Sequence, residues 1–128
     1  MTTSTYFVQA RVSDDGLYAE CSYFYDKAAT QPVEGSTLNI PLDAGACTIQ
    51  QADGSALVLL AASFKTLGHA PVMKESNFAP ADDEGSLDVS MPTTSVVTKG
   101  VVLLFSNPGA VEGLYASSDP EVTNGSGA

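Results

Sequence analysis

Apolar and polar residues alternate along much of this chain, and this alternation constrains the fold more than any other feature. The segment from Tyr6 to Val12 reads YFVQARV and places Tyr6, Val8, Ala10 and Val12 on one side. A side-chain period of two is that of a β-strand with one buried face. Residues 17–25 alternate in the same way after an Asp-Asp-Gly turn signal. We therefore expect a hairpin at the start of the chain.

Beyond this hairpin the chain breaks into short strand-like segments separated by glycine and proline. The last two flank Asn107-Pro108-Gly109, which favours a closing hairpin. The strands expected from these segments cover residues 37–40, 47–50, 87–91, 95–106 and 110–117.

The segment 56–67 has two interpretations. Ser55 before an Ala/Leu-rich run, with Gly68 after it, is also the pattern of a capped helix. Asp53-Gly54 between strand-like runs is instead a hairpin signal. We therefore predict a strand over about 56–63, joined to 47–50 by a hairpin, with a helix as the alternative. Residues 68–86 are expected to be a long loop with a short edge strand near Val72.

About eight short strands with Gly/Pro turns, and no βαβ spacing, predict an all-β fold. We expect a single antiparallel β-sandwich over residues 1–123, Greek-key-like, with 124–128 as a flexible tail. The apolar run 101–105 lacks alternation. This indicates a central strand covered on both faces, either within the chain or by a sheet shared in a dimer.

The charge balance bears on which partners the chain can bind. Its 15 acidic and 5 basic residues give a net charge of −10, which disfavours nucleic acid and anionic membranes. The longest apolar run, 56–62, is far too short to cross a bilayer. The first residues contain neither a basic nor an apolar signal segment, which predicts a cytoplasmic protein.

The residue types needed for catalysis are sparse. His69 is the only histidine, and the sequence contains no nucleophile elbow and no phosphate-binding loop. Cys21 and Cys47 form no C-x-x-C motif, and the sequence leaves open whether they pair. We therefore predict a protein that is not an enzyme and needs no cofactor. An enzyme would require a pocket that joins His69 to Glu75 or Asp88.

One acidic cluster is a candidate calcium site, since calcium takes six to eight oxygen ligands. A solvated acidic loop is the alternative interpretation, because the spacing does not match an EF-hand. The candidate ligands are Asp82, Asp83, Glu84 and Asp88.

Three tyrosines near the first hairpin are candidates for stacking on sugar rings, namely Tyr18, Tyr23 and Tyr25. The period of two places Tyr18 on the opposite face from the other two. Tyrosines at this spacing are also common as half-buried sheet residues.

The segment GLYASSDPEV, residues 113–122, resembles the C-terminus of the bacterial AidA/PixA inclusion-body family. Residues 37–40, 44–45 and 48–49 are similar to the "LNI … G … I" segment of that family, and 101–105 takes the place of its penultimate strand. The chain departs from the family in having no Trp before Asp119. The resemblance implies a cytoplasmic β-sandwich protein without catalytic residues.

The leading hypothesis from the sequence is a non-enzymatic, self-associating β-sandwich with an interaction or storage role, most simply a homodimer. Association would cover an exposed sheet edge or apolar face. The alternative is a small glycan-binding module that uses a tyrosine face or the 82–88 loop, with or without calcium.

Overall fold

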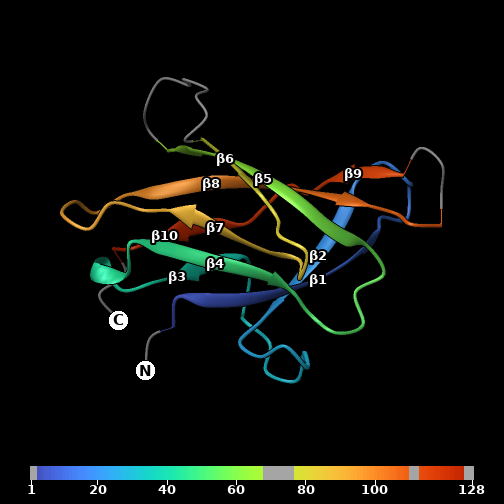
Figure 1. The fold of residues 1–128 in the computed structure, drawn as a ribbon, viewed down its shortest axis with the longest axis horizontal. Coiled ribbons are helices and arrows are strands. Elements are labelled where there is room, and N and C mark those ends of the chain that lie inside the picture. Colours follow the sequence, from blue (N-terminus) through green and yellow to red (C-terminus); the bar gives the residue numbers. More distant parts are fainter. Residues whose placement is uncertain (1–2, 68–76, 110–112, 126–128) are drawn as a thin grey trace.

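A computed structural model describes residues 3–67, 77–109 and 113–125 (Figure 1). These residues form ten strands and one short 3₁₀ turn, Leu42–Ala44. The strands are β1 Thr5–Val12, β2 Ala19–Phe24, β3 Thr37–Asn39, β4 Ala46–Gln51, β5 Val58–Thr66, β6 Phe78–Pro80, β7 Ser86–Ser90, β8 Thr98–Ser106, β9 Leu114–Ala116 and β10 Glu121–Thr123.

The strands form two sheets packed face to face, which confirms the all-β sandwich. One sheet has four strands in the order β2-β1-β4-β7, and the other has six, with β3-β10-β8-β5-β6 in order and β9 beside β8. In Figure 1, β5, β6 and β8 of the six-stranded sheet lie above β4 and β1 of the four-stranded one. Most pairs are antiparallel, but β1 pairs with β4, and β10 with β3, in parallel. The sandwich is thus mostly antiparallel, and its two parallel pairs join strands that are linked by long connections and not by hairpins.

The first hairpin is confirmed. In it β1 pairs antiparallel with β2, with Val8 opposite Tyr23. Gly16 has a φ of 75° in the connecting turn, a left-handed conformation that glycine adopts readily. Tyr6, Val8 and Ala10 face the core, as the alternation predicts.

The strand interpretation of 56–67 is confirmed by β5, but the hairpin at Asp53-Gly54 was wrong. Gly54 does turn, with a φ of 77°, yet β4 and β5 belong to different sheets. The segment between them follows β1, because Ala56 N donates to Ala10 O at 3.0 Å. Ser55 Oγ also accepts a hydrogen bond from Ala10 N. The chain therefore crosses from one sheet to the other.

The closing hairpin is confirmed by β8 and β9, which pair antiparallel. Strand β10 was not expected. It follows the cis peptide bond between Asp119 and Pro120 and lies between β3 and β8. Strand β6 is at the edge of the six-stranded sheet. Val72, near which a short edge strand was predicted, lies outside the described residues.

Asn124 belongs to the folded domain, which corrects the tail predicted from residue 124. Its side chain is buried, accepts from Val97 N and donates to Pro92 O and Ser95 O. The chain is therefore anchored one residue beyond the expected boundary.

The core lies between the two sheets and draws on both. Phe105, Leu103 and Val101 of β8 point into it, whereas Val102 is 44% exposed. The expectation that the chain itself covers both faces of 101–105 was therefore wrong. The core residues are Tyr6, Val8, Ala10, Ala19, Tyr23, Leu38, Ile40, Cys47, Ile49, Leu57, Leu59, Ala62, Phe64, Leu87, Val89, Met91, Val101, Leu103, Phe105 and Val122.

Candidate functional site

The outward side of the six-stranded sheet carries the main candidate surface, which we call the outer face. It arises because alternate residues of β5 and β8 fill the core, leaving their neighbours on the opposite side. Five of its large apolar side chains are between 37% and 63% exposed: Val58, Leu60, Phe78, Val102 and Leu114. Leu104, Ala61, Pro80 and Ala116 complete it.

Strand register places these side chains in three rows across four strands, except Leu60, which lies at a bulge of β5 between Leu59 and Ala61. In the first row, Ser63 lies opposite both Phe78 and Val102. The second row runs from Pro80 through Ala61 and Leu104 to Ala116, and the third from Val58 through Ser106 to Leu114. These rows contain no charged residue. The outer face is therefore a continuous apolar surface interrupted by two serines.

A charged row borders the outer face. Lys65 of β5 lies opposite Gly100 of β8, which lies opposite Glu121 of β10. Gly100 has no side chain between the two charged ones, and the Leu67 side chain lies against it. The charged row lines a hollow of about 570 Å³ that Val102 and Ser63 also line. Both Lys65 and Glu121 are exposed.

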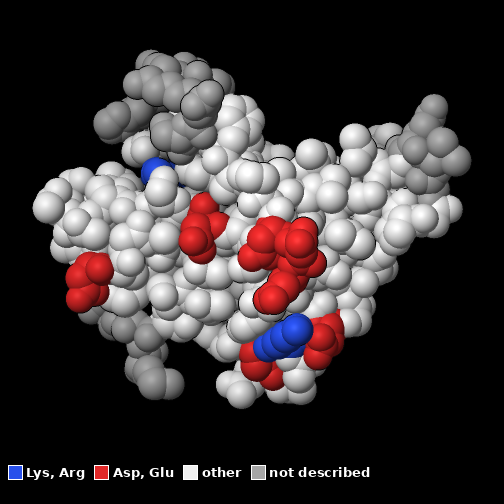
Figure 2. Space-filling view, in the orientation of Figure 1, with Lys and Arg blue, Asp and Glu red and all other residues white. Residues whose placement is uncertain are grey.

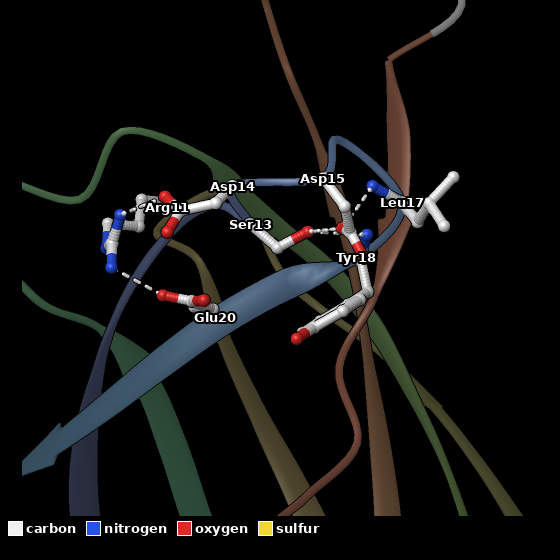
Figure 3. Close-up of polar contacts among 7 residues, drawn as sticks. All are labelled: Arg11, Ser13, Asp14, Asp15, Leu17, Tyr18 and Glu20. Atoms are coloured by element: carbon white, nitrogen blue, oxygen red, sulfur yellow. Dashed lines mark hydrogen bonds and ion pairs between the residues drawn. The ribbon is translucent and has the colours of Figure 1, made fainter.

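A second hollow, of about 660 Å³, lies beside β2 and is mainly polar. The side chain of Tyr18, 41% exposed, contributes an aromatic ring. Arg11 Nη2 donates to Glu20 Oε2, and Arg11 Nη1 lies 3.8 Å from Asp14 Oδ1 (Figure 3). Asp119 also lines the hollow, from the other sheet. The hollow thus combines one ring with carboxylates and a guanidinium.

The turn beside this hollow is held by Asp15. Its Oδ1 accepts from Ser13 Oγ at 2.6 Å and from Leu17 N at 3.1 Å (Figure 3). These hydrogen bonds, chiefly the one from Ser13, lower the pKa of Asp15 below its usual value. Ser13 Oγ also accepts from Tyr18 N, which fixes the backbone of Tyr18.

The structure separates the three candidate tyrosines. Tyr18 lines the hollow, but Tyr23 is only 2% exposed and its hydroxyl donates to Asp119 Oδ1 at 2.7 Å. Tyr25 is exposed at the other end of β2, with its ring centroid 5.7 Å from that of Tyr6. Residues 18 and 25 are about 23 Å apart along an extended chain. The three rings therefore form no common platform, and Tyr23 cannot stack on a ligand.

The candidate calcium ligands also differ in the contacts that they make. Asp82 Oδ1 accepts from the backbone N–H groups of Glu84 and Ser86 within a turn, whereas Asp88 Oδ1 accepts from Thr48 Oγ1 on β4. Asp82, Asp83 and Glu84 line a third hollow with Lys27. Figure 2 shows acidic side chains gathered on this face. Among the residues described, no three His, Cys, Asp or Glu side chains form a group suited to a metal ion.

Both cysteines are free thiols. Cys21 lies opposite Ala10 of β1, while Cys47 precedes Thr48, which pairs with Thr5. About six residues of β1, some 20 Å, separate the two positions, far beyond the Cα separation that a disulfide spans. Burial raises the pKa of each thiol to about 12. His69 and Glu75, invoked for an enzyme, lie outside the described residues.

Sequence reasoning missed one polar cluster, which surrounds Ser117 between β9 and β10. Ser117 Oγ accepts from Leu103 N at 2.8 Å and donates to Asp119 O. The Asp119 carboxylate in turn binds the Tyr23 hydroxyl of the other sheet. Asp119-Pro120 was the available signal, because proline interrupts strand pairing.

No family model matches the chain, and no curated protein matches it in sequence. The resemblance to the AidA/PixA family therefore stays a prediction from the quoted segments. Among the described residues, no helix has the length and apolar character needed to span a membrane.

Proposed function

We propose that this protein is a non-enzymatic, self-associating β-sandwich whose outer face binds a second copy of the chain. The observation that carries the proposal is the set of exposed apolar side chains in three uncharged rows on one sheet face. Contiguous apolar patches of this kind mark interaction sites on soluble proteins.

Charge restricts where a second copy can bind. Each chain carries a net charge of −10, so two copies repel wherever their carboxylates face each other. The apolar rows contain no carboxylate, so two copies that meet there keep most of their negative charge away from the contact. A strongly basic partner would instead be attracted to the acidic surface beside β7.

The size of the face is sufficient for a specific contact. Four strands about 4.8 Å apart, with rows covering about six residues of roughly 3.3 Å each, give a face of about 20 Å by 20 Å. Two such faces in contact bury on the order of 1,000 Å² in total, which is the lower bound for a specific interface.

The test is sedimentation equilibrium of the wild type and of Val102→Asp, which places a carboxylate among the exposed apolar side chains of the outer face. Ser22→Asp is the matched control, because Ser22 is exposed on the other sheet. We expect the wild type and Ser22→Asp to self-associate, and Val102→Asp to be a folded monomer by circular dichroism. A wild type that stays monomeric at millimolar concentration contradicts the proposal.

A glycan-binding role is the second candidate, supported by the hollow that places Tyr18 beside the Arg11–Glu20 pair. An exposed ring with adjacent carboxylate and guanidinium groups suits a polyhydroxyl ligand. Glycan-array binding that is lost in Tyr18→Ala and retained in Tyr25→Ala would support this role. Repeating the array with calcium and with a chelator tests whether the metal takes part.

A further inference from the structure

The charged row beside the outer face contains two opposite charges that do not meet within one chain. Lys65 and Glu121 lie on β5 and β10, the strands on either side of β8. Each is one strand spacing from Gly100, so their backbones are about 10 Å apart. Neither forms an ion pair with any residue that the structure describes.

Symmetry restricts how a second copy can cover this surface. Two copies that use the same face are related by a two-fold axis lying in the interface. An axis parallel to β8 exchanges the two sides of that strand, so β5 of one copy lies over β10 and β9 of the other. Lys65 of each copy then lies over Glu121 of its partner.

Other orientations bring like charges together or leave the charges without partners. An axis perpendicular to the strands and through the charged row puts Lys65 over Lys65 of the second copy, and Glu121 over its own equivalent. Moving that axis to the centre of the face puts both charges over apolar rows, where they lose water without gaining a partner.

The axis parallel to β8 also matches the apolar rows where they cross β5, β8 and β9, while β6 of each copy lies outside this overlap. Leu114 and Ala116 of β9 lie on the same side of β8 as Glu121, so they face Val58 and Ala61 of the second copy. Val102 and Leu104 lie on the axis and face their own equivalents. Mean strand directions are then nearly parallel, as in aligned packing of two sheets.

We infer that two copies pack face to face about a two-fold axis parallel to β8, with Lys65 of each opposite Glu121 of the other. This inference rests on the proposed self-association and specifies its geometry. The two ion pairs lie at the border of the interface, where such pairs set orientation more than affinity.

The test is a charge-reversal series measured by sedimentation equilibrium at low ionic strength. We expect Lys65→Glu and Glu121→Lys each to weaken self-association about five- to thirtyfold, because two attractive pairs become repulsive. The double variant should return to within about threefold of the wild type. Lys27→Glu and Asp83→Lys, which make the same charge changes away from the outer face, are the matched controls.

Mixing the two single variants gives the sharpest result. A mixed dimer of Lys65→Glu with Glu121→Lys restores both opposite-charge pairs, whereas each variant alone contains none. We therefore expect the mixture to associate more tightly than either variant alone, and the advantage to decrease as salt is raised. The control variants, mixed in the same way, should gain no more affinity than the change in their net charges explains.

The outcomes separate this inference from the proposed function. A wild-type dimer with no gain on mixing, or reversals no different from their controls, overturns the axis and leaves self-association in place. A monomeric wild type overturns both. If a reversal variant fails to fold, Lys65→Gln and Glu121→Gln replace it, and each should then weaken the dimer relative to Lys27→Gln.

Discussion

Ser117 shows how one small side chain can supply a hydrogen bond that an irregular sheet would otherwise lack. The chain leaves β9 here and returns as β10, so the backbone of β8 loses a regular partner between them. Ser117 Oγ fills that gap for Leu103 N, and Ser117 N donates to Leu103 O. The hydroxyl is buried, so water cannot replace it.

At this scale we predict that Ser117→Ala lowers the free energy of unfolding by about 1–3 kcal/mol, because it leaves Leu103 N without its partner. Ser118→Ala is the control, since Ser118 is exposed, and it should change stability by less than about 0.5 kcal/mol. Urea unfolding followed by circular dichroism measures both. Equal effects of the two variants would show that the hydroxyl does not support β8.

The hairpin of β8 and β9 likewise depends on one small residue. The connection between them ends at Gly113, whose carbonyl accepts a hydrogen bond from Asn107 N. A Cβ atom on Gly113 would lie 2.9 Å from the backbone oxygen of Asn107 and 2.6 Å from its Cβ. Backbone cannot move aside as a flexible side chain can.

We therefore predict that Gly113→Ala separates the ends of this hairpin and destabilises the protein by about 1–3 kcal/mol. Gly109→Ala is the matched control in the same connection, because its Cβ would have only an ordinary contact, 3.5 Å from Asn107 Oδ1. Thermal unfolding of the two variants should differ by several degrees. Because Leu114 belongs to the outer face, Gly113→Ala should also weaken self-association more than Gly109→Ala does.

The elements also show what alternation can and cannot predict. It located β1, β2 and β7, because the side-chain period is a local property of each strand. It failed at Asp53-Gly54, where a turn is real but the partner strand is set by packing between sheets. Strand β10 was missed because three residues after a proline carry no period, and its pairing with β3 depends on residues far away in sequence.

The candidate site was predictable to a smaller extent. The lack of alternation in 101–105 pointed to a strand whose second face needs cover, and Val102 is indeed on an exposed face. Which strands flank β8, however, is decided by tertiary packing. The rows that join Phe78 to Val102, and the border formed by Lys65 and Glu121, therefore could not be read from the sequence.

At the scale of the whole molecule, the core contains weak acids that are neutral when buried. Burial raises the pKa of Tyr6, Cys21 and Cys47 to about 12, and that of Tyr23 above its usual value. The ordinary values are 10.0 for tyrosine and 9.0 for cysteine. Between these values and about 12, the unfolded chain has released protons that the folded chain still holds.

Stability must then fall as the pH rises through this window, because the unfolded state is favoured by ionisation. The contribution of each group is fully present below its ordinary pKa and is lost toward its folded value. For Cys47 alone, the loss is about 2–3 kcal/mol by pH 11. Four such groups together approach the whole stability of a domain of this size, about 5–15 kcal/mol.

We therefore predict unfolding free energies that are nearly constant from pH 7 to 8.5, fall steadily above pH 9, and reach zero near pH 11 to 12. Urea unfolding at half-unit intervals of pH measures this. The protein concentration is kept low enough that self-association does not contribute to the measured stability. Cys47→Ala should start lower at pH 8, because it leaves a cavity, yet lose less stability between pH 9 and 11. Parallel curves for the two proteins would mean that the Cys47 thiol ionises as readily in the folded core as in the unfolded chain.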